Sequence, residues 1–305
     1  MKNNSNNISV LVLGGTGFIG SNLIQGLLAK GYQVTSLSRT KVSINDAGNY
    51  LFGDITDSKL MRKLVGQNYD LIYHCAGFSG VGTEKNPQDS KKINVESLKK
   101  LFDLILKLSP ETRVVMCGSR LEYGKVDKIP VSENQSTKPI GVYGKHKLRA
   151  SKLAMDFSTN RGLKVTILRI SNIYGPHREF SFNHYNVINH FIDMAREGKN
   201  LTIFGDGEQL RDYLYIGDLI ELMILVGENE KSIGKIYNVG FGEGRPFRDL
   251  PEAIAKKFGV KVVYKPWPTS YKQVETGDYV TDISKVEKEL RWRPKKSFED
   301  WIDSL

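Results

Sequence analysis

The chain has 305 residues, a length typical of about two domains. A composition of 40% hydrophobic and 26% charged residues excludes global disorder, and a core of this size needs no disulfide or metal to hold it. The formal net charge of +10 predicts an anionic partner, which could be nucleic acid, acidic lipid or a phosphorylated small molecule.

The cysteines and the apolar runs indicate the compartment. Cys75 and Cys117 lie in separate apolar runs, which predicts two buried thiols in a reducing environment. No Cys/His spacing resembles a zinc site, so we expect no metal. The polar N-terminal tail lacks the hydrophobic region of a signal peptide, and no run reaches the ~18 apolar residues of a membrane span. We therefore expect a soluble, cytoplasmic protein with no membrane contact.

Short apolar runs alternate with amphipathic segments through about residue 240. The runs are apolar on both faces, which is typical of a parallel sheet covered by helices on each side. Helical stripes cover residues 19–28 and 98–108, and the second ends at Ser109-Pro110. This alternation predicts an α/β fold with a Rossmann-type, doubly wound parallel sheet. The expected strands are 8–13, 33–37, 69–75, 113–117 and 165–170.

The pattern changes after residue 173, where Gly175-Pro176 predicts a turn. A further strand is expected at 235–239 and a short one at 261–264, with helices at 247–258 and 283–290. We predict a larger sheet domain and a smaller C-terminal substrate domain. The division assigns 1–174 plus about 210–240 to the first, and about 175–209 plus 241–305 to the second.

A glycine-rich segment, GGTGFIG at 14–20, follows the first expected strand and opens the first helix. Glycines at these places permit a tight turn, a close approach of a pyrophosphate, and close packing of the helix on the sheet. The helix N-terminus then offers free N–H groups to the phosphates. The alternative is a glycine turn without a ligand. The residues predicted to contact a dinucleotide cofactor here are Gly14, Thr16, Gly17, Phe18, Ile19 and Gly20.

The end of the second strand predicts which dinucleotide binds. An NAD enzyme usually carries an Asp or Glu there for the ribose hydroxyls, whereas this chain has Ser38-Arg39-Thr40. A guanidinium beside a hydroxyl suits a 2′-phosphate, so NADP is favoured, with NAD possible and a solvated surface arginine as the alternative interpretation. Asp54 and Ile55 are predicted to bracket the adenine. Ala76 and Gly77 would lie beside the phosphates.

Tyr143 and Lys147 are four residues apart, which on a helix puts both side chains on one face. A nearby ammonium favours the phenolate form of a tyrosine and suits it to proton transfer. Ser119 comes just after the strand expected at 113–117, so its hydroxyl could join the substrate oxygen to Tyr143. These three residues are the candidate catalytic group.

At this point the sequence resembles the extended short-chain dehydrogenase/reductases, the family of nucleotide-sugar epimerases, dehydratases and reductases. The resemblance implies a Rossmann domain, a small domain for the nucleotide sugar, and commonly a homodimer that would use the 98–108 helix and the Tyr143 helix. The segments that carry it are GGTGFIG (14–20), GDITD (53–57), YHCAG (73–77), Ser119 with Tyr123-Gly124, YGKHK (143–147), RISNIYGP (169–176), RDYLYIGD (211–218) and DISKVEKELRWRP (282–294).

The resemblance also implies roles for single residues. Tyr143 would be the acid/base, Lys147 would hold the nicotinamide ribose, and Ser119 would polarise the reacting oxygen. Asn172, Asn186 and Arg211 would grip the substrate diphosphate. The alternative for Arg211 is an ion pair with Asp212 or Asp218.

Two departures from the family pattern matter. The 4,6-dehydratases carry an Asp-Glu or similar pair after the catalytic hydroxyl residue, whereas this chain has Arg120-Leu121, so a dehydratase is not expected. A basic residue often precedes the Gly-Asp of the tail, and here that place holds Glu275. Lys272 is the candidate replacement for the missing cation.

The leading hypothesis is an NADP(H)-dependent reductase of a 4-keto-6-deoxy nucleotide hexose, because reductions draw on NADPH. The alternative is a nucleotide-sugar 4-epimerase with tightly bound NAD(P). A remote alternative is a non-catalytic dinucleotide- or nucleic-acid-binding protein, which the basic clusters at 145–152 and 291–296 permit. We expect no nucleic acid partner, since no RNA-binding aromatic signature appears and a binding protein has no need of the catalytic group.

Overall fold

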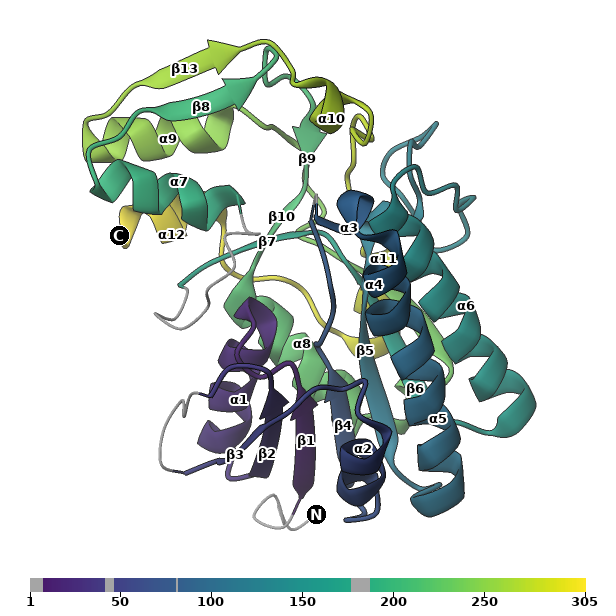
Figure 1. Ribbon diagram of the computed structural model, residues 1–305. Coiled ribbons are helices and arrows are strands. Elements are labelled where there is room, and N and C mark those ends of the chain that lie inside the picture. The colour runs from purple at the N-terminus through teal and green to yellow at the C-terminus, as the bar shows by residue number, and fades with distance from the viewer. Residues whose placement is uncertain (1–7, 42–46, 81, 177–186) are drawn as a thin grey trace.

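The computed structural model describes residues 8–41, 47–80, 82–176 and 187–305. A large lobe is built on a parallel sheet of seven strands in the order β11-β6-β5-β4-β1-β2-β3, and a smaller lobe lies over one end of it (Figure 1). The predicted Rossmann-type fold is confirmed. The strands are β1 (Ser9–Leu13), β2 (Gln33–Ser38), β3 (Asn49–Phe52), β4 (Leu71–His74), β5 (Arg113–Ser119), β6 (Val165–Ile170) and β11 (Lys235–Val239).

Alternate residues of β1 explain why the sheet is covered on both sides. Val10 and Val12 pack in one apolar core, whereas Leu11 and Leu13 pack in the other. A strand buried on both faces reads as a continuous apolar run, as predicted. The first core takes in helices α1 (Phe18–Ala29), α8 (Ile216–Glu228) and α11 (Ser284–Leu290), and the second takes in α2 (Ser58–Val65), α5 (Ser97–Leu108) and α6 (Val142–Arg161).

β5 is longer than the sequence predicted. Gly118 and Ser119 continue the register opposite Arg169 and Ile170 of β6, so Ser119 is the last residue of the strand and does not follow it. The apolar stripe of α5 is buried in the second core, while Lys99, Lys100 and Lys107 cover its outer face. The predicted homodimer through α5 and α6 stays a prediction. The short helices α3 (Gly82–Lys85) and α4 (Pro87–Lys91) and a π-helical turn (Lys92–Glu96) lead into α5.

The smaller lobe has its own aromatic core. Tyr174, Phe191, Ile254 and Trp301 are buried together there, and Trp301 lies 5.0 Å from Tyr174 between ring centres. β8 and β13 pair in parallel, and helices lie on one side of them (Figure 1). The elements of this lobe are α7 (Val187–Arg196), β8 (Leu201–Phe204), α9 (Asp249–Phe258), β13 (Val262–Lys265) and α12 (Phe298–Asp303).

Short strands join the two lobes, and one segment departs from the predicted division. Residues 284–290 were assigned to the smaller domain, but α11 packs against β11 and buries Val286 and Leu290 in the first core of the sheet domain. None of the described helices is both long and apolar enough to cross a membrane. The remaining elements are β7 (Asn172–Tyr174), β9 (Leu210–Arg211), β10 (Tyr213–Tyr215), β12 (Arg245–Pro246), α10 (Thr269–Lys272) and the 3₁₀ turns Arg120–Glu122 and Glu230–Ser232.

Candidate active site

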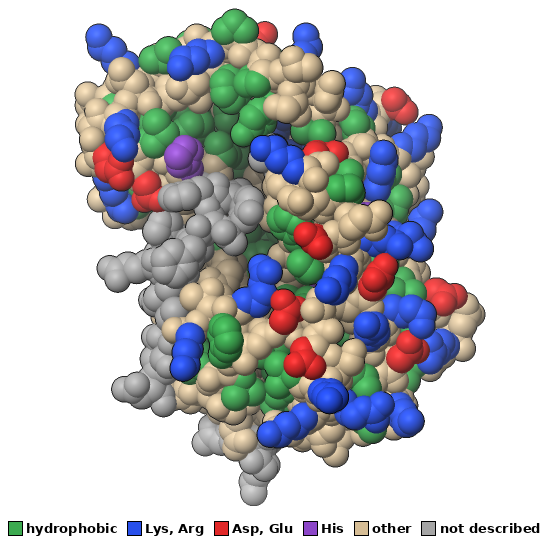
Figure 2. Space-filling model, viewed as in Figure 1, with side chains coloured by type: hydrophobic (Ala, Val, Ile, Leu, Met, Phe, Trp, Pro, Cys, Tyr) green, Lys and Arg blue, Asp and Glu red, His purple; other side chains and the backbone are tan. Residues whose placement is uncertain are grey.

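A cavity of about 830 Å³ lies at the carboxyl ends of the central strands. In Figure 2 a recess runs between the two lobes. Ser119 and Asn172 line the cavity together with every residue predicted to contact the cofactor. Those residues are Gly14, Thr16, Gly17, Phe18, Ile19, Gly20, Ser38, Arg39, Asp54, Ile55, Ala76, Gly77, Tyr143 and Lys147.

The glycine loop is packed so closely that side chains would not fit. Gly14 has a φ of 86°, and a Cβ there would lie 2.6 Å from the backbone nitrogen of Ala76. A Cβ at Gly20 would lie 2.2 Å from the carbonyl oxygen of Gly14. Gly17 caps α1 without a side chain, so the first-turn N–H groups have no side-chain acceptor from the cap. Such a cradle at a helix N-terminus fits the pyrophosphate of a dinucleotide.

The end of the cavity at β2 carries one cation and one carboxylate. Arg39 is exposed, and no carboxylate of the described residues lies within ion-pair distance of it. Burial alone would raise the pKa of Asp54, but hydrogen bonds from Thr56 and the charge of Arg39 lower it. Ser38 Oγ donates to the carbonyl of Thr40 at 2.8 Å. The guanidinium of Arg39 therefore remains available to a ligand phosphate.

Lys147 is anchored beneath the candidate acid/base. It is 9% exposed, and its Nζ donates to the carbonyl of Cys117 at 2.7 Å. The ammonium lies 5.7 Å from the ring centre of Tyr143, one helical turn earlier on α6. Burial alone would lower the pKa of Lys147, but Tyr143, Cys117 and Glu122 raise it above its ordinary value. A positive charge is thus held next to the phenol, as the spacing predicted.

Ser119 is oriented by the turn that follows β5. Its Oγ accepts from the N–H of Leu121 at 3.2 Å, and its own N–H donates to Glu122 Oε1 at 3.0 Å. Glu122 is fully buried and forms an ion pair with Arg169 at 2.8 Å. Its carboxylate also accepts from Ser151 Oγ. Glu122 is therefore a buried support for Ser119 and does not line the cavity.

The described residues that line the cavity include only one carboxylate, that of Asp54. It lies at the β2 end of the cavity, where the adenosine was predicted, and not beside Ser119. Position 121, where a dehydratase would carry the second acid, is the apolar Leu121, which also lines the cavity. Within the described part of the chain, Tyr143 therefore has no carboxylate beside it.

Asn172 and Arg211 are the two predicted diphosphate residues of the family resemblance that lie in the described part of the chain. Asn172 lines the cavity, and its Oδ1 accepts from Arg120 Nε at 3.2 Å. The Arg211 side chain is 6% exposed, donates to the carbonyl of Gly277 at 2.7 Å, and pairs with the carboxylate of Glu275. Arg211 and Lys272 do not line the cavity, and Lys272 is exposed at the end of α10. Their substrate contacts stay predictions.

Arg211 does not form the ion pair with Asp212 or Asp218 that was the alternative prediction for it. The Asp212 carboxylate accepts from the backbone N–H groups of Phe241 and Thr281 at 2.7 and 2.9 Å. Asp218 accepts from two backbone N–H groups of the tail. The chain brings a third carboxylate, Glu275, to Arg211 from 64 residues away. Asn186 lies outside the described residues.

The sequence reasoning missed residues that come from other segments. Val187 and Ile188, at the start of α7, line the cavity from the smaller lobe, and Ile93 lines it from the π-helical turn. No local motif marks them, because only the packing of the two lobes brings them to the strand ends. Cys75 and Cys117 also line it as free thiols, with their sulfur atoms 4.0 Å apart.

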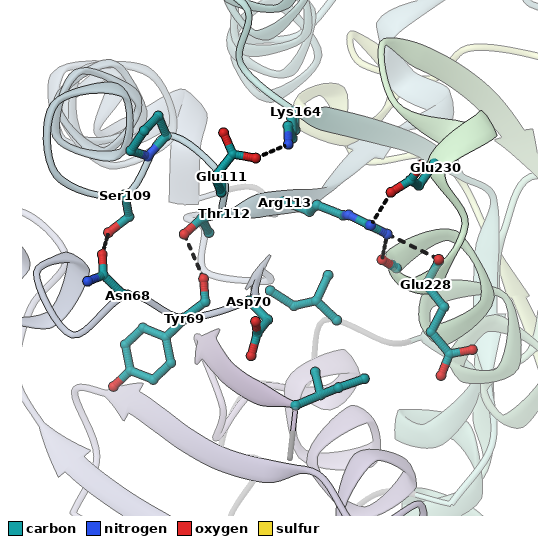
Figure 3. Close-up of a pocket in the computed structure, with 14 residues that line it drawn as sticks. Asn68, Tyr69, Asp70, Ser109, Glu111, Thr112, Arg113, Lys164, Glu228 and Glu230 are labelled. Atoms are coloured by element: carbon teal, nitrogen blue, oxygen red, sulfur yellow. Dashed lines mark hydrogen bonds and ion pairs between the residues drawn. The ribbon is translucent and has the colours of Figure 1, made fainter. Parts of the chain in front are cut away.

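A second cavity, of about 620 Å³, opens at the opposite, amino end of the strands (Figure 3). Its basic side chains are paired with carboxylates of the same cavity: Arg113 with Glu230 at 2.9 Å and Lys164 with Glu111 at 2.5 Å. Within the described ranges, no cluster of three His, Cys, Asp or Glu side chains is arranged to hold a metal ion. The candidate catalytic residues Ser119, Tyr143 and Lys147 all line the first cavity.

Known proteins resemble this chain in sequence and in fold. Residues 10–240 match the NAD dependent epimerase/dehydratase family. A putative UDP-glucose 4-epimerase of Methanocaldococcus jannaschii is 30% identical over 303 residues, covering 96% of this chain and 95% of that protein. The structure of a UDP-glucose 4-epimerase from Thermotoga maritima, solved with UDP-glucose, is similar with a TM-score of 0.89 at 26% identity, covering 97% of this chain and 96% of that one.

A second solved structure has the same fold and contains a cofactor. It is a dTDP-glucose 4,6-dehydratase from Streptomyces venezuelae with NAD and TYD bound, similar with a TM-score of 0.87 at 26% identity over 97% of this chain and 95% of that one. The family match covers most of the chain, and the curated relative covers almost all of it. The chain therefore belongs to the NAD-dependent epimerase/dehydratase family of enzymes.

Proposed function

We propose that this protein is a nucleotide-sugar 4-epimerase that keeps one nicotinamide dinucleotide bound. The observation that carries the proposal is a cavity with a glycine cradle at one end and Tyr143, Lys147 and Ser119 at the other, with no carboxylate among the described residues beside them. The similarity to 4-epimerases over nearly the whole chain supports the same reaction.

The residues divide the work of an epimerisation as follows. A bound nicotinamide dinucleotide supplies reversible hydride transfer at C4 of the sugar. The Tyr143 oxygen takes the proton of the C4 hydroxyl. The resulting 4-keto sugar must then turn its opposite face toward the cofactor site before Tyr143 returns the proton to the same oxygen, which inverts C4. Ser119 Oγ donates a hydrogen bond to that oxygen as its charge changes, and the fixed ammonium of Lys147 stabilises the phenolate. The two halves of the reaction use the same groups in opposite directions, so one acid/base is sufficient.

A dehydratase is not supported by this arrangement. Elimination of water needs a further base and a further acid near the sugar, beyond the acid/base that serves the redox step. The two positions after Ser119 hold Arg120 and Leu121, and Glu122 is committed to its ion pair with Arg169. Among the described residues beside Ser119, no free carboxylate remains to carry the extra proton transfers.

The 4-keto-6-deoxy reductase favoured from the sequence has less support than its alternative. The same catalytic group would serve a reductase, so the choice rested on Arg39 and on a preference for NADP. The similar proteins are by name epimerases, and the dehydratase neighbour holds NAD. Arg39 remains a residue-based reason to expect NADP as the bound form, and competition between the two dinucleotides tests it.

A nucleic acid ligand is not part of the proposal. In the basic cluster at 145–152, Lys147 points inward to the carbonyl of Cys117. In the cluster at 291–296, Arg293 pairs with Glu287 and Lys295 with Glu221. We attribute the net positive charge to binding of the phosphates of a dinucleotide and a nucleotide sugar. The smaller lobe would bind the nucleotide part, and the family resemblance predicts a homodimer, which light scattering tests.

The test is direct. The purified protein is incubated with UDP-glucose, UDP-galactose and UDP-N-acetylglucosamine without added cofactor, and the sugars are analysed by NMR. Appearance of the C4 isomer, absent with Tyr143→Phe, supports the epimerase. Consumption of added NADPH with a 4-keto-6-deoxy nucleotide sugar, without isomerisation of any of the three, would overturn it in favour of the reductase.

A further inference from the structure

Arg120 directly follows Ser119 in the chain, and its hydrogen-bond partners among the described residues carry no charge. Its Nε donates to Asn172 Oδ1 at 3.2 Å and its Nη1 to Thr276 Oγ1 at 3.1 Å, and both acceptors are neutral. Its guanidinium lies 5.4 Å from the ring centre of Tyr279. Among the described residues, no carboxylate lies within ion-pair distance of it. Desolvation, followed by the charge of Arg211, lowers the pKa of Arg120 to about 10.

Arg211, by contrast, is already neutralised. Its guanidinium donates to the carbonyls of Leu210 and Gly277 and to the carboxylate of Glu275. Glu275 also accepts from the N–H of Gly277, so the loop holds it in place. Two neighbouring guanidiniums thus share one carboxylate. The uncompensated positive charge of this pair lies on Arg120.

Arg120 does not itself line the cavity, but the residues around it do. The residues before and after it, Ser119 and Leu121, both line the cavity, and so does its partner Asn172. Ser119 is the group proposed to contact the reacting oxygen. The long side chain of Arg120 extends from there toward Asn172 and Thr276, on the side of the cavity where Arg211 lies.

We propose that Arg120 binds the diphosphate of the nucleotide-sugar substrate and is the principal cation of that subsite, with Arg211 beside it. This inference rests on the proposed function. A planar guanidinium pairs with phosphate oxygens through two N–H groups. The two neighbouring positive charges of Arg120 and Arg211 would be stabilised by a bound anion such as the diphosphate. The resemblance implies a cation at position 275, where this chain has Glu275, so the subsite would draw its positive charge from Arg120.

The experiment measures binding of UDP and of UDP-glucose by isothermal titration calorimetry, at low and high salt. The variants are Arg120→Gln, Arg120→Lys, Glu275→Gln and, as a charge-matched control, Arg62→Gln on the exposed surface of α2. Each variant is first checked for the circular dichroism and melting temperature of the parent, so that a folding defect is not read as weak binding.

We expect Arg120→Gln to weaken both ligands by the same factor, about 10- to 100-fold, as for the loss of one charged hydrogen-bond partner. Glu275→Gln should instead tighten both, because it removes the carboxylate that competes with the phosphates. Arg120→Lys should fall between the parent and Arg120→Gln, and the differences should shrink at high salt. Arg62→Gln should bind as the parent does.

Other outcomes overturn the inference. If Arg120→Gln weakens UDP-glucose but leaves UDP unchanged, Arg120 contacts the sugar and not the diphosphate. If Arg120→Gln does not fold, equal UDP affinity of Arg120→Lys, Glu275→Gln and the parent refutes the assignment. A parent protein that binds neither UDP nor UDP-glucose would overturn the proposed nucleotide-sugar function together with this inference. Unchanged binding by the Arg120 variants overturns this inference alone.

Discussion

Protonation of a buried histidine should couple the stability of this protein to pH. His74 is the last residue of β4, is 5% exposed, and lies near the ammonium of Lys147. Burial, and then the charge of Lys147, lower the pKa of His74 from 6.5 to about 4. The folded protein therefore keeps this imidazole neutral at a pH where the unfolded chain would protonate it.

The sign and size of the effect follow from linkage. Below about pH 6.5 the unfolded state binds a proton that the folded state does not, so the free energy of unfolding falls as the pH falls. The loss ends near pH 4, where the folded protein also takes up the proton. At ~1.36 kcal/mol for each pKa unit, the whole difference amounts to about 3 kcal/mol. About 2 kcal/mol of this should be lost between about pH 7.5 and about pH 5.

Urea unfolding of the parent and of His74→Gln at these two pH values measures the effect. The glutamine has no titration in this range, so the drop in unfolding free energy from pH 7.5 to pH 5 should be larger in the parent by about 2 kcal/mol. Other groups titrate in both proteins and cancel in the comparison. Equal drops in the two proteins would refute the buried, neutral state of His74.

Four further substitutions test the site. Tyr143→Phe should remain folded and cofactor-loaded, with turnover reduced by about 10²- to 10⁴-fold because only the proton carrier is removed. Arg39→Ala should weaken NADP binding by about 10- to 100-fold and leave NAD unchanged, as measured by fluorescence titration. Arg211→Ala should raise KM more than it lowers kcat, because it removes binding that ground state and transition state share. Glu122→Gln should lower the free energy of unfolding by about 3 kcal/mol, because the buried guanidinium of Arg169 loses its counter-ion.

Each has a clear contrary result. Near-parent turnover of loaded Tyr143→Phe would remove the tyrosine from the chemistry. Equal affinity of the parent for NAD and NADP would overturn the cofactor preference read from Arg39. A collapsed kcat with an unchanged KM in Arg211→Ala would point to a role in the reaction itself. A Glu122→Gln protein as stable as the parent would show that Arg169 finds compensation elsewhere.

The sequence by itself determined the sheet and the cradle. Continuous apolar runs predicted β1, β2, β4, β5, β6 and β11, because strands buried on both faces show no alternation of apolar and polar residues. The glycines marked the loop, since their places leave no room for a Cβ. Tyr143 and Lys147 are one helical turn apart, so a local spacing sufficed to predict that they lie together.

Only the tertiary structure decided which charges meet. Arg211 and Glu275 are 64 residues apart, and Glu122 and Arg169 are 47 apart, so no local pattern could pair them. The same holds for α11, whose apolar face was predicted but whose place against β11 was not. Periodicity and steric limits act between neighbours in the chain and are readable from it. Ion pairs and contacts between the lobes join residues that are far apart in the sequence. Their partners are therefore known only from the path of the whole backbone in the folded structure.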